Sequence, residues 1–214
     1  MKKIKFLLVA CLLGIAATAS AQFANSKSSS NGGSGNSSSL ENWQSIKVSY
    51  MPVTFDGDGG GEIDFSGAMI SYLKGYAISQ DMPLFVETGL GVSWIGGEIE
   101  DTEVDLNFFS VNVPVNLGYK YAFNDKCSIA PFVGITLRGN IFGNYKFEGE
   151  SLNAFDEDEV GEESKLKRFN FGWQVGLGVN INSLYIGASY GSDFNEIIEN
   201  GKGIVPQITL GLNF

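Results

Sequence analysis

The stretch FNFGWQVGLGVNI, from Phe169 to Ile181, alternates strictly between large apolar residues and small or polar ones. A period of two is that of a β-strand with one apolar and one polar face. The alternation does not say which face lies inside. In a water-soluble barrel or sandwich the apolar face packs inward, whereas in an outer-membrane barrel it faces lipid and the polar face fills the lumen.

Seven more runs of this kind follow one another between residue 43 and the end of the chain, and none of this region predicts a helix. The run at 62–78 is the least regular, and its two faces are not assigned. Short, turn-rich connections follow the second, fourth and sixth runs, and longer ones follow the third, fifth and seventh, a sorting typical of outer-membrane barrels. The expected strands cover residues 43–55, 62–78, 83–95, 108–123, 127–141, 169–181, 184–191 and 204–214.

Three features place the apolar face outward. The polar face is rich in Gly, Ser, Asn, Gln and Thr, whereas a water-facing strand carries more Lys and Glu. The apolar runs cover about 12 residues, and a tilted spanning strand needs roughly 9–11. Aromatic residues gather near strand ends, where a membrane barrel has its girdles; they are Trp94, Phe108, Phe109, Tyr119, Tyr121, Phe169 and Phe171.

The predicted fold is therefore all-β: an eight-stranded, antiparallel, up-and-down transmembrane β-barrel over residues 43–214. A lumen of this size is filled by side chains. The alternative is a soluble, lipocalin-like barrel with the apolar face inward and a ligand inside.

The N-terminal segment predicts export. Residues 1–21 combine early lysines, an apolar run and the ending Ala19-Ser20-Ala21, as in a cleaved signal peptide. Residues 22–42 form a flexible Ser/Gly-rich segment that we expect in the periplasm. A competing interpretation takes LVAC at residues 8–11 as a lipoprotein signal with Cys11 as the modified residue. With cleavage after Ala21, Cys11 is removed and Cys127 is the one thiol of the mature chain, partly buried or at the edge of a turn.

The composition excludes several functions. A formal net charge of −10 argues against nucleic acid as a partner. The chain contains no His, which removes a Ser-His-Asp triad and any His-ligated metal site. We therefore expect neither an enzyme nor a cofactor.

Four segments of the chain, PLFVETGLGVSW, FFSVNVPVNLGYKY, APFVGITLRGN and PQITLGLNF, resemble the small outer-membrane β-barrel family that is widespread in Bacteroidetes and often labelled porin-like. The resemblance implies an outer-membrane location, contact with outer-membrane lipids, and insertion by the barrel assembly machinery. The ending, with Leu210, Leu212 and Phe214 on one face, resembles the C-terminal signal through which such barrels are recognised for assembly.

Three groups of residues are candidates for a functional site. Polar and charged residues on the lumen face predict a buried polar network, because an unpaired buried charge is costly; they are Glu87, Lys120, Arg138, Gln174 and Gln207. The loop beginning DGDGGG places Asp56, Asp58 and Asp64 as in an EF-hand but lacks its bidentate Glu, which makes it at most a weak cation loop. The acidic loop 147–165 is either a solvated, mobile loop or a contact for an unidentified surface partner.

These features favour a barrel with a filled lumen and a structural or surface-interaction role. The alternatives are a narrow channel for ions or very small solutes and, with less support because no His is present, an enzyme that acts on lipid.

The orientation of the strand at 169–181 can be tested with one pair of variants. Val175→Arg puts a cation on the lipid face, at a cost of about 2–4 kcal/mol near the bilayer midplane, whereas Gln174→Arg puts it on the lumen face. We expect Val175→Arg to block assembly more strongly, measured as loss of the heat-modifiable gel band from outer-membrane fractions. Equal assembly of the two variants would contradict the outward assignment.

Overall fold

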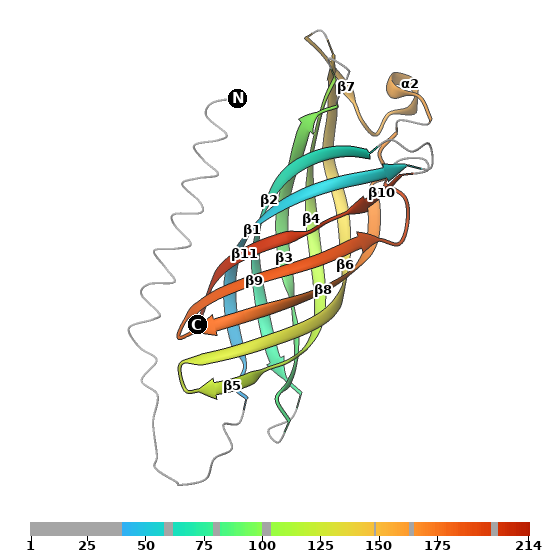
Figure 1. The fold of residues 1–214 in the computed structure, drawn as a ribbon. Helices are drawn as coiled ribbons and strands as arrows, with labels where there is room; N and C mark the ends of the chain where they lie inside the picture. Colours follow the sequence, from blue (N-terminus) through green and yellow to red (C-terminus); the bar gives the residue numbers. More distant parts are fainter. Residues whose placement is uncertain are drawn as a thin grey trace. The chain divides into compact units, whose positions relative to one another are not determined.

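The computed structural model describes residues 40–57, 62–78, 82–99, 104–147, 149–162, 165–197 and 201–214. The predicted signal peptide and most of the Ser/Gly-rich segment lie outside these residues. The described chain is built almost entirely from strands (Figure 1). They are β1 (Trp43–Gly57), β2 (Glu62–Ala77), β3 (Leu84–Glu98), β4 (Val104–Tyr119), β5 (Tyr121–Asn124), β6 (Cys127–Phe147), β7 (Glu150–Asn153), β8 (Phe169–Ile181), β9 (Leu184–Asp193), β10 (Gly201–Ile204) and β11 (Gln207–Asn213), with one short helix, α2 (Glu157–Val160).

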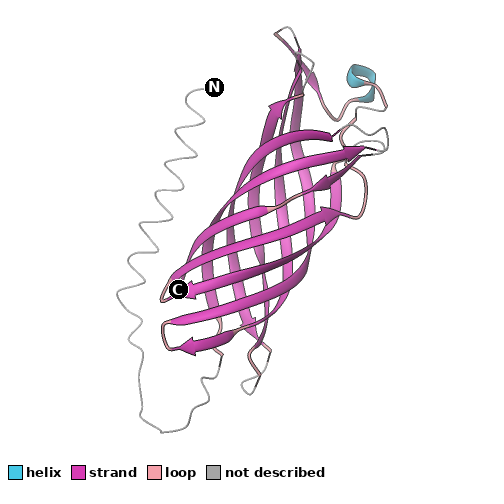
Figure 2. Ribbon diagram, in the orientation of Figure 1, coloured by secondary structure: helices cyan, strands magenta, loops and turns pink. Residues whose placement is uncertain are grey.

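The strands close into an antiparallel barrel (Figure 2). Each long strand pairs with the next, and β1 pairs with both β2 and β11, so the sheet has no free edge along the wall. Since β5 continues β4, β10 and β11 share one position, and β7 pairs only with β6, the wall has the eight positions predicted from the sequence. The described residues include no helix with the length and apolar character needed to cross a bilayer.

The apolar face of the strands points outward, as predicted. In β8, Asn170, Gly172 and Gln174 are buried, whereas Val175 and Leu177 are exposed. The same alternation runs around the wall and excludes the lipocalin-like arrangement. Its exposed residues include Val48, Tyr50, Leu90, Val92, Val115, Leu117, Val133, Ile186, Ile208 and Leu210.

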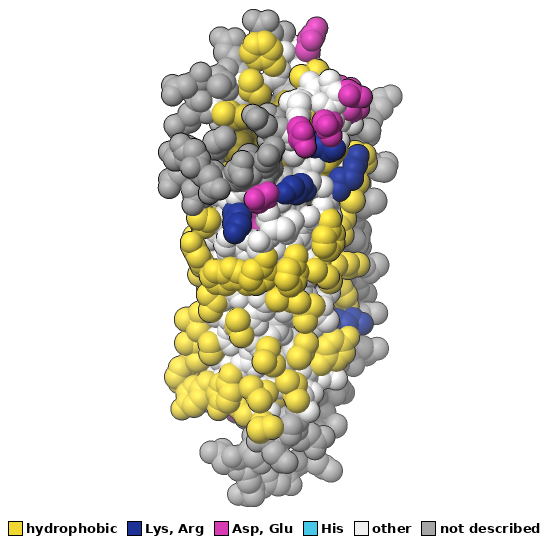
Figure 3. All heavy atoms as spheres, turned by 90° about the vertical axis from the view of Figure 1, so that its right-hand side faces the viewer, with side chains coloured by type: hydrophobic (Ala, Val, Ile, Leu, Met, Phe, Trp, Pro, Cys, Tyr) yellow, Lys and Arg dark blue, Asp and Glu magenta, His cyan; other side chains and the backbone are white. Residues whose placement is uncertain are grey.

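This polarity inverts toward the end of the barrel that carries β7 and α2, which we call the outer end. There the inward side chains of β1 to β4 are apolar, and outward ones, such as Asp64 on β2, Asp105 on β4 and Lys146 on β6, are polar. Figure 3 shows the same change on one face: apolar side chains cover the middle and lower parts, and charged ones lie above them. The inward residues form a cluster like the core of a soluble protein; from the strands these are Met51, Val53, Phe55, Phe65, Ile95, Leu106 and Phe108, and Val205 joins them from the gap between β10 and β11.

The inversion corrects one prediction and completes another. Phe108, expected in the aromatic girdle, is only 1% exposed and lies inside this cluster, and its neighbour Phe109 pairs with Phe142 on the outside. The irregular run at 62–78 becomes assignable: Phe65 and Leu73 point inward, and Tyr72 points outward. Phe65 points inward because that end of β2 lies in the inverted region, whereas Leu73, opposite Ser45 of β1, is an apolar side chain inside the polar part of the lumen.

On β6, a β-bulge marks the boundary between the part of the wall with a polar interior and the part with an apolar interior. Phe109 pairs with Phe142, but Ser110 pairs with Asn140, so Ile141 is an extra residue in the wall. Ile141 and Phe142 are consecutive and both exposed. The alternation therefore restarts one residue later, and Gly143 faces inward.

The acidic loop is more ordered than a solvated, mobile loop. It contains β7 and α2, with the Asp156 side chain capping α2 by accepting a hydrogen bond from the Asp158 N–H. The backbone N–H of Asn153, at the end of β7, donates to the Glu159 carboxylate (2.6 Å). Ala154 and Phe155, between β7 and α2, are buried in the inner cluster.

The last strand differs from the single run predicted at 204–214. It starts at Gly201 and is interrupted after Ile204. Pro206 lies in the gap between β10 and β11, and Pro52 lies between the two stretches of β1 that pair with them. Neither proline can donate to a ladder, so the pairing lapses there.

The inverted cluster can be tested with two Phe variants on neighbouring strands. Phe108→Ala opens a cavity in a packed interior, and we expect it to lower the free energy of unfolding by about 3–5 kcal/mol. The matched control Phe142→Ala removes a side chain that is 67% exposed, so its loss should be clearly smaller. Urea unfolding of the refolded protein in lipid vesicles gives both values, and equal losses would refute the inversion.

Candidate functional site

The lumen of the barrel holds the densest group of buried polar side chains, beginning with an ion pair between β1 and β3. The Lys47 Nζ lies 2.8 Å from both carboxylate oxygens of Glu87. These two side chains are 6% and 9% exposed. They reach each other across the intervening strand β2, and Lys47 also sits over the ring of Tyr185, 3.9 Å from its centroid. A buried charge pair of this kind is retained only where both partners are well hydrogen-bonded.

A second ion pair lies nearer the outer end. Arg138 on β6 donates from Nη1 to Asp193 Oδ2 on β9 (3.2 Å), and both side chains are buried. The backbone of Gly203 also hydrogen-bonds to Asp193. The Nε of Arg138 is buried and has no partner among the described residues.

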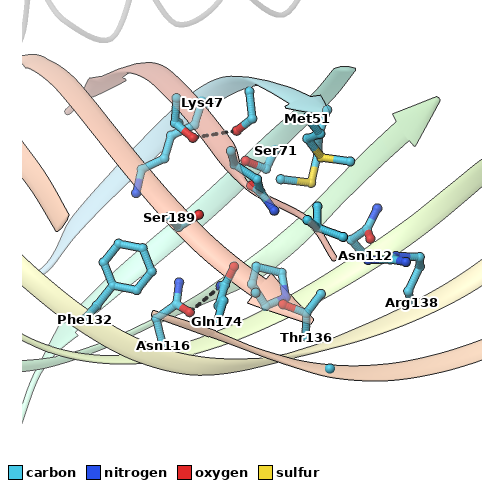
Figure 4. Close-up of a pocket in the computed structure, with 18 of the residues that line it drawn as sticks. Lys47, Met51, Ser71, Asn112, Asn116, Phe132, Thr136, Arg138, Gln174 and Ser189 are labelled. Carbon is cyan, nitrogen blue, oxygen red and sulfur yellow. Dashed lines mark hydrogen bonds between the residues drawn. The ribbon is translucent and has the colours of Figure 1, made fainter. Parts of the chain in front are cut away.

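Neutral polar side chains form hydrogen bonds with one another in the lumen around the two ion pairs. Gln174 Nε2 donates to Asn116 Oδ1 (2.6 Å), the contact drawn as a dashed line in Figure 4, where Asn112 also lies beside Arg138. Further lumen bonds join side chains of neighbouring strands at 2.6–2.8 Å; they include Asn112–Ser93, Ser110–Asn140, Asn140–Asn170 and Ser49–Thr209. Such a network, largely satisfied, fixes the side chains that fill the lumen.

Two small cavities remain inside this network. The larger, of about 70 Å³, lies between the two ion pairs and is lined by residues of both, together with Met51, Asn112 and Gln174. The smaller, of about 20 Å³, lies at the opposite end of the barrel from β7 and is lined by Lys47, Glu87, Lys120, Trp43 and Tyr185 among others. One water needs about 10–15 Å³ of such volume, so the cavities hold a few waters rather than a solute.

Loop residues close the lumen at the outer end. Ala154, Phe155, Leu166 and Ile197 pack into the inner cluster, and we call these four residues the plug. The plug is tied down by backbone bonds from Leu166 N to Ala154 O and from Lys167 N to Ile197 O, both 2.8 Å. The guanidinium of Arg168 lies over the Phe155 ring at 4.3 Å.

The structure brings the five predicted lumen residues together only in part. Glu87, Arg138 and Gln174 belong to the hydrogen-bonded network, and Gln207 lines the larger cavity. Lys120 lines the smaller cavity but pairs with no described carboxylate.

Sequence reasoning missed the ion-pair partners of Glu87 and Arg138. Lys47 stood on the polar face of its strand, two residues from Ser45 and Ser49, but nothing in the sequence paired it with Glu87. Asp193 lies two residues beyond Gly191, so extending the alternation of β9 would have found it.

The predicted cation loop is described only in part. Asp58 is not among the described residues; Asp64 is exposed and accepts a hydrogen bond from Thr54 Oγ1 (2.6 Å). Within the described part of the chain, no three acidic or thiol side chains are grouped to hold a metal ion. Calcium binding at Asp56, Asp58 and Asp64 stays a prediction. Leu210 and Leu212 are exposed on the outer face of β11, and Phe214 follows it.

Comparison with known proteins shows which family has this architecture. The family model described as outer membrane protein beta-barrel domain matches residues 7–214. No curated protein matches the chain. Neisserial surface protein A has a similar solved structure (TM-score 0.52, 12% identity, covering 82% of this chain and all of that one). At that identity the likeness shows the fold alone.

Two further solved structures have lower TM-scores. Ail, the attachment invasion locus protein of Yersinia pestis, has a TM-score of 0.48 and 17% identity, covering 82% of this chain and all of that one. The outer membrane enzyme PagL has a TM-score of 0.41 and 11% identity, covering 77% of this chain and 98% of that one.

The buried pair Lys47–Glu87 can be tested by a double-mutant cycle. Lys47→Met leaves a buried carboxylate unpaired, and we expect a loss of about 3–5 kcal/mol in the free energy of unfolding. Adding Glu87→Gln should recover part of that loss. Lys165→Met, which breaks the exposed pair Lys165–Glu157, is the control and should cost below about 1 kcal/mol. A Lys47→Met loss no larger than that of the control would show that the lumen pair is not coupled.

Proposed function

This chain belongs to the outer membrane protein β-barrel family and is located in the outer membrane; from that premise we propose that it is a sealed barrel whose outer end is a surface for interaction. In this proposal the chain is neither an open pore nor an enzyme. The lumen side chains serve to hold the barrel in one conformation.

The observation that carries the proposal is the plug. A pore needs a continuous polar path, but at the outer end the lumen is filled by apolar side chains from four strands and two loops. Ile197 and Ala154 are completely buried, and Phe155 and Leu166 nearly so. Moving these four side chains into water would expose apolar surface that is now buried, so the closed state is favoured.

A narrow channel is the second candidate, and the hydrated lumen supports it. The two cavities share Lys47, Glu87 and Tyr185 in their linings and lie one behind the other below the cluster. A channel would require the plug to leave. The same lumen gives no support to lipid chemistry, because its two described buried carboxylates are each paired with a cation.

The outer end has the features of an interaction surface. The acidic residues Glu157, Asp158 and Glu159 are exposed on α2, and α2 is held in place by its cap and by the bond from Asn153. A fixed, exposed negative surface favours a basic partner. Outer-membrane lipids would cover the apolar band, and the barrel assembly machinery would recognise the ending Leu210, Leu212 and Phe214.

Planar-bilayer recording tests the sealed state. We expect no steady conductance from the wild-type barrel above detergent controls. The double variant Phe155→Ala/Leu166→Ala removes most of the plug volume and should produce frequent openings. The control Phe147→Ala truncates an exposed aromatic residue at the end of β6 and should stay closed. Steady wild-type conductance would overturn the sealed-barrel proposal and favour the channel.

A further inference from the structure

The smaller cavity, which we call the vestibule, carries an uncompensated positive charge. Two ammonium groups, those of Lys47 and Lys120, line it with a single carboxylate, that of Glu87. The same excess holds for the lumen as a whole: among the described inward-facing residues, Lys47, Lys120 and Arg138 stand against Glu87 and Asp193. The vestibule therefore has a net charge of about +1 in a partly buried space lined also by four aromatic residues, where electrostatic interactions are stronger than in water.

Glu87 pairs with Lys47 and leaves Lys120 without a carboxylate partner among the described residues. Both of its carboxylate oxygens already accept from Lys47 Nζ at 2.8 Å. Lys120 has no carboxylate oxygen within 4.0 Å in the described part of the chain, and its ammonium instead lies over the Trp43 ring, 5.1 Å from the centroid. An aromatic face attracts a cation only weakly and does not accept its three N–H donors.

The position of Lys120 is fixed by its surroundings. Its backbone N–H donates to Pro83 O (2.7 Å), and its side chain follows the inward face of β4 after Asn116 and Gly118. Trp43 is held by an edge-to-face contact with Phe85 at 5.0 Å. The ammonium is therefore held at the vestibule wall by packing rather than by an opposite charge.

We infer that the vestibule binds one small monovalent anion, of the size of chloride, beside Lys120 Nζ. An anion neutralises the excess charge and accepts the free N–H donors, whereas water does only the second. The volume of about 20 Å³ is enough for one ion little larger than a water molecule. The inference does not depend on whether the outer end is sealed, because the vestibule lies at the other end of the lumen.

Thermal unfolding of the refolded, full-length barrel in detergent tests the site. We expect the unfolding temperature of the wild type to rise saturably, by a few degrees, as sodium gluconate is replaced by sodium chloride or bromide at constant ionic strength, because ligands of the native state alone stabilise it. Lys120→Gln should abolish the halide-specific rise. Lys126→Gln is the matched control: it removes the same charge from the exposed turn after β5 and should retain the rise.

Three outcomes would overturn the inference: no difference between halide and gluconate for the wild type, an undiminished rise in Lys120→Gln, or loss of the rise in Lys126→Gln. If Lys120→Gln does not fold, anomalous diffraction from crystals of the wild type in bromide decides the question. A bromide peak beside Lys120 Nζ supports the site, and a vestibule with no anomalous peak refutes it.

Discussion

Closure of the backbone hydrogen-bond network is the constraint on which the rest of this structure depends. Within a bilayer no water is available to satisfy an N–H or C=O group, so a sheet can span it only if its first and last strands pair. Here β1 provides that closure by pairing with β2 on one side and with β10 and β11 on the other. Once the wall is closed, the inward side chains of all eight strand positions share one narrow lumen. The small residues of the lumen follow from this crowding: a Cβ on Gly178 or Gly187 would overlap the ring of Tyr185.

The closed wall faces lipid along one part of its length and water along the other. In the membrane-facing part the barrel has a polar interior and an apolar exterior, and toward the outer end the arrangement is that of a soluble protein. The hydrophobic effect acts on opposite faces in the two parts, since lipid covers one and water the other. The change of polarity is a better marker of the outer membrane boundary than any single aromatic residue, as the burial of Phe108 illustrates.

The sequence predicted the wall well and the outer end poorly. Period-two alternation is local information, and it located each strand and its faces wherever one environment applied throughout, as in β8. It failed at β2, where apolar residues such as Phe65 and Tyr72 lie on opposite faces, and in the acidic loop, where Ala154 and Phe155 are buried by distant strands. The lumen was predictable residue by residue but not pair by pair: Glu87 and Arg138 were recognisable as inward charges, whereas their partners depend on which side chains meet across the barrel axis.

The extra residue Ile141 has a consequence for how this wall tolerates changes in length. If β6 ran through Ile141 without a bulge, the residues that follow would exchange faces: Phe142 would turn inward, and Gly143, which leaves room for the Phe155 ring, would turn outward. Deleting Ile141 itself removes only the bulge, because Asn140 and Gly143 then still face inward and Phe142 still faces outward. Deleting one residue from a regular part of the strand instead turns the residues beyond it to the other face. The bulge therefore gives this strand a position at which its length can change by one residue without a change of faces.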